Sequence, residues 1–242
     1  MESISNIRRL PSFWRGSVHQ TLATLDKPIR FTPSGPRPIV LIPGAFCTSS
    51  VMNRLGNKLI ELGRSVCVPP SFAYYYSALA NLCRLPKAAR DFIKWLNQAG
   101  QEYGFDQIDA VGHSNGGLIA LLAQDMVDQG EAKCAVRVKR VFTMAAPFKG
   151  LPNAKVLSPM VPCCRDLVAG SDTLQRIARV RQLVVHCLVA EGDFLVPPAS
   201  QFPEDQTGTV MEGFQHMDFI VGTDEKVERT AKEIVKWLGT EC

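Results

Sequence analysis

The five residues Gly112-His113-Ser114-Asn115-Gly116 lie between two segments with different hydrophobic patterns. Residues 108–111 form a short apolar run that suits a buried strand. Beyond Gly116 the apolar residues recur at helical spacing, at Leu118, Ile119, Leu121, Leu122, Met126 and Val127. The pattern predicts a strand, a sharp turn and a helix, with Ser114 in a strained conformation at the tip of the turn. The flanking glycines suit such a turn, because bulkier neighbours would collide with the serine. Ser114 is therefore a candidate nucleophile.

The alternation of strand-like and helical patterns continues along the chain. Apolar runs typical of strands occupy residues 38–43, 65–68, 138–144, 183–190 and 209–211, and helical patterns cover residues 51–62, 86–102 and 223–238. This alternation predicts an α/β fold with a mainly parallel central sheet flanked by helices. In a chain of 242 residues we expect one such domain at residues 38–242, preceded by an N-terminal arm at residues 1–37.

Two lid-like segments, at about residues 71–85 and 147–180, interrupt the alternation, and we expect both to be irregular. Each follows the carboxyl end of a predicted strand, which is the edge where open α/β sheets place their binding sites. We interpret them as walls or a lid over a site. The alternative is that they are structured surface connections without any gating motion.

A serine hydroxyl needs a general base, and the chain has four histidines that could supply it. His216 is the candidate, because it follows the last predicted strand and precedes the final helix, in a loop at the carboxyl edge of the sheet. His113 adjoins the nucleophile and should point away from it, and His19 lies in the N-terminal arm. His186 is in the middle of a predicted strand, where we expect a buried ring with its hydrogen bonds satisfied.

Asp193 is the candidate for the carboxylate that orients this base, because it comes directly after the predicted strand at residues 183–190. A carboxylate there can accept a hydrogen bond from the Nδ1–H group of His216 and fix the tautomer of the ring. Three other acids are weaker candidates: Glu191 at the strand end, Asp172 in the second lid-like segment, and Asp218, which follows the histidine too closely.

An oxyanion formed at Ser114 needs two N–H donors, and one is expected from the backbone of Asn115. The other is expected from Ala45, in the loop after the first predicted strand, with Phe46 as the alternative donor. Cys47 in the same loop is interpreted as a lining residue, because no base is placed to activate it. Substrate contacts are expected from four apolar or aromatic side chains: Phe46, Tyr75, Phe194 and Leu195.

The chain order Ser114, Asp193, His216, each just after a predicted strand, is the order found in α/β-hydrolases. Residues 38–238 resemble that superfamily, and more narrowly its lipase- and esterase-like members. The likeness extends to Pro43-Gly44, Gly-His-Ser-Asn-Gly-Gly at 112–117, and the stretches 144–150, 166–174 and 192–197. Pro43 in place of histidine and Ala146-Pro147 in place of Thr-Pro depart from the pattern and leave the subfamily open.

The resemblance implies a serine hydrolase that cleaves carboxylic esters through an acyl-enzyme and needs no cofactor or metal. Its expected substrate is a small-molecule acyl ester or a lipid, and the apolar residues of the lid-like segments suggest an apolar acyl group. Two alternatives stay open. One is an acyltransferase or thioesterase with the same triad, and the other is a non-catalytic binding protein on a hydrolase fold.

The composition of the chain limits which classes of partner and which cellular compartment we expect. A formal net charge of +4 without a long basic run gives little support for nucleic-acid binding. No apolar stretch approaches the roughly 18 residues that a membrane helix needs, so we expect no stable membrane insertion. The first ten residues lack the apolar core of a secretory signal, which predicts a cytoplasmic protein. The eight cysteines lack zinc-site spacing and are expected to be reduced thiols. The oligomeric state is left open.

Overall fold

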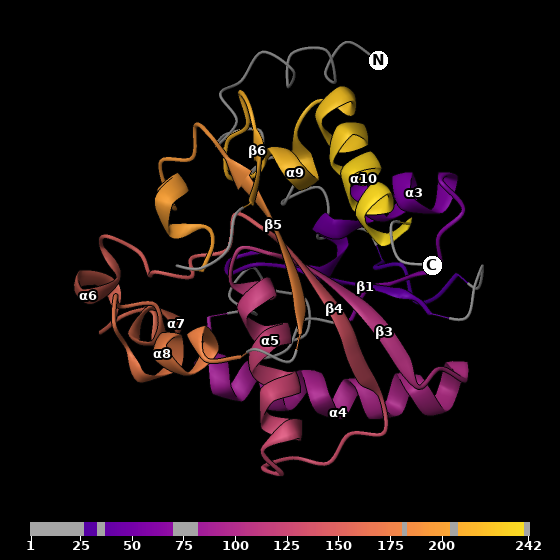
Figure 1. Cartoon of the computed structure of the whole chain (residues 1–242), viewed down its shortest axis with the longest axis horizontal. Helices are drawn as coiled ribbons and strands as arrows, with labels where there is room; N and C mark the ends of the chain where they lie inside the picture. The colour runs from indigo at the N-terminus through magenta and orange to yellow at the C-terminus, as the bar shows by residue number, and fades with distance from the viewer. Residues whose placement is uncertain (1–26, 33–36, 70–81, 181–182, 204–207, 240–242) are drawn as a thin grey trace.

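A parallel sheet of six strands runs through the structure, a computed structural model that describes residues 27–32, 37–69, 82–180, 183–203 and 208–239 (Figure 1). Every neighbouring pair of strands is parallel. The predicted fold class, an α/β protein with a parallel central sheet, is confirmed. The strands lie side by side in the order β2-β1-β3-β4-β5-β6. In chain order they are β1 (Ile39–Ile42), β2 (Val66–Cys67), β3 (Gln107–His113), β4 (Arg137–Met144), β5 (Val184–Ala190) and β6 (Gly208–Met211).

Helices cover both faces of this sheet (Figure 1). One face carries α4 and α5, which pack with the strands into a core that includes Phe92 and Leu118. The other face carries α3, α9 and α10, whose core includes Leu55 and Ile234. The five helices are α3 (Asn53–Glu61), α4 (Leu85–Tyr103), α5 (Asn115–Asp128), α9 (Asp218–Val221) and α10 (Asp224–Gly239), and the 3₁₀ turn η1 (Ser49–Met52) precedes α3. Because both faces are covered, β1 is buried along its whole length and β3 at all but its first residue.

The composition of the second lid-like segment predicted an irregular structure, but the segment is partly helical. It contains three short helices, α6 (Ala154–Leu157), α7 (Pro162–Asp166) and α8 (Asp172–Ala178), which lie to one side of the sheet (Figure 1). Proline suits the first turn of a helix, where no intrahelical N–H donor is needed, and α7 begins with Pro162. Ser171 caps α8, since its hydroxyl accepts the backbone N–H of Leu174 at 3.3 Å.

A buried carboxylate fastens this helical segment to the body of the fold. Asp166 at the end of α7 accepts two hydrogen bonds from the guanidinium of Arg84, each 2.8 Å long. It also accepts the backbone N–H of Leu85 at 2.8 Å and the hydroxyl of Thr173 at 2.8 Å. The carboxylate therefore ties α7 and α8 to the first turn of α4, where an unpaired N–H group would otherwise remain.

Parts of the expected organisation fall outside the described residues. These are most of the predicted N-terminal arm and residues 70–81 of the first lid-like segment. Within the arm, Thr32 pairs with Val66 in a single antiparallel bridge at the edge of β2. None of the helices in the described ranges is both long enough and apolar enough to cross a bilayer.

Candidate active site

The carboxyl ends of four strands bring the predicted site residues to one edge of the sheet. Residues 43–47 follow β1, Ser114 follows β3, Asp193 follows β5 and His216 follows β6. The topological switch point of the sheet lies between β1 and β3, because the chain passes from β1 to β2 on one side of β1 and then to β3 on the other side. Ligand sites of open α/β sheets lie at such a point.

Ser114 forms the tip of the turn between β3 and α5, with no residue between either element and the serine. Its φ of 54° and ψ of −128° lie outside the regions that serine ordinarily adopts. The turn requires glycine on both sides of the serine, because neighbouring backbone leaves no room for a Cβ. A Cβ on Gly112 would lie 2.2 Å from the nitrogen of Gly117, and one on Gly116 would lie 2.4 Å from the oxygen of Ile42. The backbone N–H of Ser114 donates to the carbonyl of Met144 on β4 at 2.8 Å, which fixes the turn to the sheet.

The loop after β1 lies directly against this serine. A Cβ on Gly44 would lie only 2.8 Å from the Cβ of Ser114, so the close approach requires glycine. Phe46, two residues later, has a positive φ of 57°. Asn115 begins α5 on the other side of Ser114, and both polar atoms of its side chain are buried without a hydrogen-bond partner among the described residues. The two predicted oxyanion donors, Ala45 and Asn115, thus flank the serine in the loop and the helix that adjoin it.

The structure brings Asp193 and His216 together. The Nδ1 atom of His216 lies 2.7 Å from Oδ2 of Asp193, and both residues are buried. The other carboxylate oxygen, Oδ1, accepts the backbone N–H groups of Leu195 at 2.9 Å and Val196 at 3.0 Å. A carboxylate held by its own loop in this way can orient the imidazole and stabilise it when it is charged.

The three weaker acid candidates have other partners or positions. Glu191 accepts the backbone N–H of Gly213 at 3.0 Å. Asp218 accepts the backbone N–H of Gln215 at 2.9 Å and the ammonium of Lys226 at 2.6 Å. Asp172 is exposed in the first turn of α8. Asp193 is the acid that contacts His216.

The two other histidines of the sheet differ in their surroundings. His186 on β5 is half-buried, not buried as expected, and it hydrogen-bonds through Nε2 to the hydroxyl of Thr209 at 3.1 Å. His113 at the end of β3 contacts the candidate base: its Nε2 lies 2.8 Å from the backbone oxygen of His216. Burial lowers the pKa of His113 to about 3, so the ring is neutral.

Comparison with known proteins agrees with this fold. The family model of an alpha/beta hydrolase of unknown function (DUF915) matches residues 80–158, which include the turn at Ser114. No curated protein matches the chain. Similar solved structures include a mature lipase of Bacillus licheniformis, with a TM-score of 0.62, 13% identity and coverage of 88% of this chain and 99% of the lipase. They also include a thermophilic esterase of Thermogutta terrifontis, with a TM-score of 0.58, 15% identity and coverage of 86% and 91%.

A monoacylglycerol lipase of Paleococcus ferrophilus has a TM-score of 0.57 and 18% identity, with coverage of 88% of this chain and 98% of the lipase. The chain has the α/β-hydrolase fold. Its sequence matches the model of an alpha/beta hydrolase family over residues 80–158, and its fold is similar to the folds of these lipases and this esterase. At these identities the solved structures establish the hydrolase fold.

Gln201 contacts the candidate acid and has no signature in the sequence. Its side chain is fully buried, and its Nε2 donates to Oδ2 of Asp193 at 3.2 Å and to the carbonyl of Val196 at 2.7 Å. Its Oε1 accepts the backbone N–H of Ala190 at 2.7 Å. One side chain thus connects the end of β5 with the loop that holds the acid.

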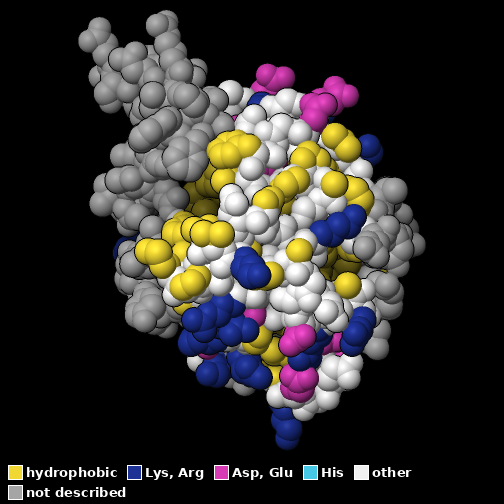
Figure 2. All heavy atoms as spheres, turned by 90° about the vertical axis from the view of Figure 1, so that its left-hand side faces the viewer, with side chains coloured by type: hydrophobic (Ala, Val, Ile, Leu, Met, Phe, Trp, Pro, Cys, Tyr) yellow, Lys and Arg dark blue, Asp and Glu magenta, His cyan; other side chains and the backbone are white. Residues whose placement is uncertain are grey.

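The predicted substrate-binding side chains lie on the surface around this edge of the hydrolase fold. Phe46 is 48% exposed, Phe194 63% and Leu195 42%. Tyr75 lies outside the described residues. Hydrophobic side chains gather on the face that carries α6, with Lys and Arg clustered below them (Figure 2), and Val156 and Met160 are the most exposed apolar residues there.

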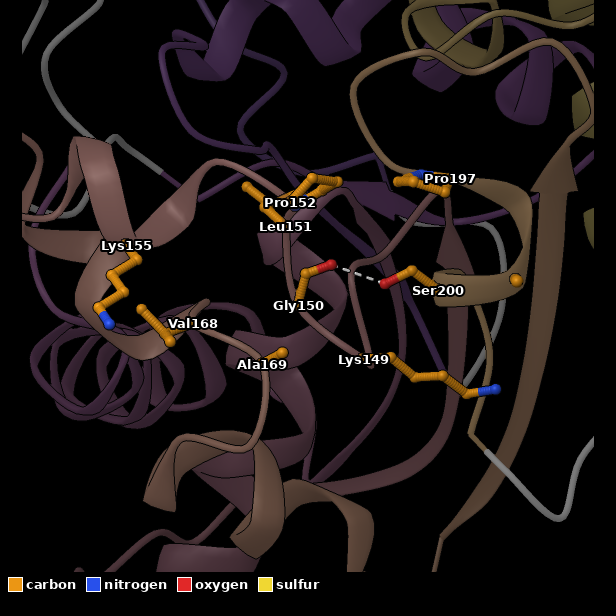
Figure 3. Close-up of a pocket in the computed structure, with 10 residues that line it drawn as sticks. Lys149, Gly150, Leu151, Pro152, Lys155, Val168, Ala169, Pro197 and Ser200 are labelled. Carbon is orange, nitrogen blue, oxygen red and sulfur yellow. Dashed lines mark hydrogen bonds between the residues drawn. The ribbon is translucent and has the colours of Figure 1, made fainter.

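A pocket of about 380 Å³ opens beside α6, and we call it the side pocket. Its walls are mainly apolar, and the hydroxyl of Ser200 donates across it to the carbonyl of Gly150 at 2.7 Å (Figure 3). Lys155 and Lys149 stand at opposite ends, and the ammonium of Lys149 lies 5.0 Å from the centre of the Phe202 ring. The lining residues are Lys149, Gly150, Leu151, Pro152, Lys155, Val168, Ala169, Pro197, Ala199 and Ser200.

The seven cysteines of the described part of the chain form no disulfide there. Cys47, close to the candidate oxyanion loop, is buried, and burial raises its pKa to about 12. A thiol with so high a pKa does not supply the thiolate that nucleophilic catalysis requires. Within the residues that the structure describes, no three His, Cys, Asp or Glu side chains are grouped so as to hold a metal ion.

Proposed function

We propose that the protein is a serine hydrolase that cleaves carboxylic esters with Ser114 as nucleophile. The observation that carries this proposal is the 2.7 Å contact of His216 with Asp193, at the same sheet edge where Ser114 occupies a strained turn before α5. A strained turn between a strand and a helix exposes the serine hydroxyl, so that it can reach the carbonyl carbon of a substrate.

In the proposed reaction the Oγ atom of Ser114 attacks the ester carbonyl while Nε2 of His216 takes its proton. Asp193 keeps the Nδ1–H group of the imidazole directed toward itself and stabilises the imidazolium. The backbone N–H groups of Ala45 and Asn115 stabilise the oxyanion. His216 then protonates the departing alcohol, and a water molecule deprotonated by the same ring releases the acyl group from the serine.

The proposed substrate carries an apolar acyl group. Phe46 lies in the loop that packs on Ser114, while Phe194 and Leu195 follow the candidate acid, and all three are exposed. The side pocket, which includes Pro197 of the same acid loop, is large enough to receive part of such a group. Filling it with Ala169→Trp should therefore lower kcat/KM for long-chain esters more than for short ones.

Hydrolysis of p-nitrophenyl esters with acyl chains of graded length tests the proposal. The wild-type protein should turn over at least one member of the series, and Ser114→Ala should lower that turnover by about a million-fold while leaving the fold unchanged. Adding an alcohol such as glycerol separates hydrolysis from acyl transfer, since a transferase would release mainly the new ester. No turnover of any ester or thioester by a folded wild-type protein would instead favour a binding protein.

A further inference from the structure

We propose that His113 is a positioning residue of the site: its Nε2–H group holds the backbone carbonyl of His216 and thereby fixes the base relative to the nucleophile that follows His113 in the chain. The inference rests on the proposed function, because it assigns a role to His113 only if His216 is the base. It concerns a buried histidine that the proposed reaction itself does not use.

The hydrogen bond joins two parts of the chain that are far apart in the sequence. His113 and His216 are 103 residues apart, and Nε2 lies 2.8 Å from the carbonyl oxygen. A carbonyl oxygen only accepts, so Nε2 must carry the hydrogen and Nδ1 is the unprotonated atom. The centres of the two imidazole rings are 4.8 Å apart and their planes are inclined at 60°. The His113 side chain thus contacts the candidate base through both the backbone and the ring of His216.

The same ring also contacts the loop expected to supply an oxyanion donor. A Cβ placed on Gly44 would lie 3.1 Å from Nδ1 of His113 and 2.8 Å from the Cβ of Ser114. Nδ1 itself is buried and has no hydrogen-bond partner among the described residues. The ring of His113 is therefore packed between the loop after β1 and the loop after β6, with the nucleophile attached to its own backbone.

The neutral state of His113 suits this role. Burial is the main cause of its low pKa, and the nearby ring of His216 lowers it further. During the proposed reaction His216 becomes positively charged, and a second imidazolium 4.8 Å away would oppose that charge. A residue that holds the base while staying uncharged avoids this cost, which a lysine or arginine in the same place would impose.

Three substitutions of His113 separate the hydrogen bond from simple filling of space. His113→Phe keeps a ring of similar size without a donor. His113→Gln keeps an N–H donor at about the reach of Nε2, and His113→Asn has its amide nitrogen nearer the position of Nδ1, too short to reach the carbonyl. His186→Phe is the matched control, because it removes a half-buried imidazole whose Nε2 bonds to Thr209, away from the site.

The readouts are kcat and KM for a soluble short-chain ester, the rate of covalent labelling by a fluorophosphonate, and urea unfolding for each variant. We expect His113→Phe and His113→Asn to lower kcat by about 100-fold with little change in KM, as a small displacement of a catalytic group does. His113→Gln should recover most of the loss. His186→Phe should lower stability and leave kcat near the wild-type value.

The outcomes are distinguishable. If wild type is labelled and His113→Phe is labelled at the same rate, the positioning role is wrong and the proposed function stands. Equal losses in the Gln, Asn and Phe variants would also overturn it, since the donor would then not matter. If His113→Phe does not fold, the comparison of Gln with Asn decides the question in the same way. If wild type is folded and not labelled at all, the proposed function fails and this inference fails with it.

Discussion

Gln201 donates a hydrogen bond from its side-chain amide to the carboxylate of Asp193 at 3.2 Å, and that carboxylate contacts the Nδ1 atom of His216 at 2.7 Å. Gln201 also bonds to the backbone of Ala190 and Val196. The candidate acid is therefore held by a neutral, fully buried side chain, just as the candidate base is held by His113.

Replacing Gln201 with leucine should damage both stability and activity. The change leaves the backbone N–H of Ala190 and the carbonyl of Val196 without their partner, which should lower the free energy of unfolding by about 3 kcal/mol. It also frees the acid loop, so kcat should fall. Urea unfolding and ester turnover check this, with Gln124→Leu as control. Gln124 is a buried glutamine of α5 bonded to the backbone N–H of Val138, and its loss should lower stability alone. Equal effects of the two variants on kcat would contradict the role of Gln201.

Asp193→Asn should lower ester turnover by about ten-thousand-fold, because an amide in place of the carboxylate stabilises the wrong tautomer of His216. Asp172→Asn, an exposed change on α8, should have only a modest effect. The two kcat/KM values, measured on proteins with matched unfolding curves, provide the test. The reverse ranking would move the acid from the loop after β5 to the helical segment.

Protonation of His113 should make the protein less stable in acid. The unfolded chain takes up a proton at this residue below its ordinary pKa of about 6.5, whereas burial lowers the pKa to about 3 in the folded protein. Acidification across that window therefore favours unfolding. Between pH 7 and pH 5 this residue should lower the free energy of unfolding by about 2 kcal/mol. Urea unfolding at both pH values should show a smaller difference for His113→Gln, and an unchanged difference would contradict the buried neutral ring.

Cys47 should be inert despite its place beside the candidate oxyanion loop. Burial raises the pKa of its thiol to about 12, so almost none is ionised at pH 8. Iodoacetamide should leave Cys47 unmodified in the native protein and alkylate it after unfolding in urea, as peptide mass spectrometry would show. Cys47→Ala should keep ester turnover close to wild type. A loss as large as that of Ser114→Ala would make the thiol part of the chemistry.

The sequence predicted the parts of this structure that have local causes. Continuous apolar runs indicated the buried parallel strands, and Ser114, Asp193 and His216 were predicted as site residues because each comes shortly after a strand. The parallel sheet then places all such positions at one edge. The short helices α6 to α8 were missed because Pro152, Pro159 and Pro162 indicated an irregular segment, although proline at the first position of a helix is favourable.

Two residues of the site had no local sign. Gln201 lies in a loop of mixed composition, and only the folded chain brings its amide to Asp193. The hydrogen bond of His113 to His216 joins residues 103 positions apart and has no sequence pattern. Long-range side-chain contacts of this kind depend on how whole elements pack, which periodicity does not report.

Covalent labelling of the full chain by a fluorophosphonate tests the central claim most directly, because it needs no knowledge of the natural substrate. Intact-mass and peptide analysis should show one adduct, located on Ser114. The adduct should be absent from folded Ser114→Ala and form much more slowly in His216→Ala, in which no base activates the serine. An adduct on another residue, or labelling that persists in Ser114→Ala, would contradict the assignment of Ser114 as the nucleophile.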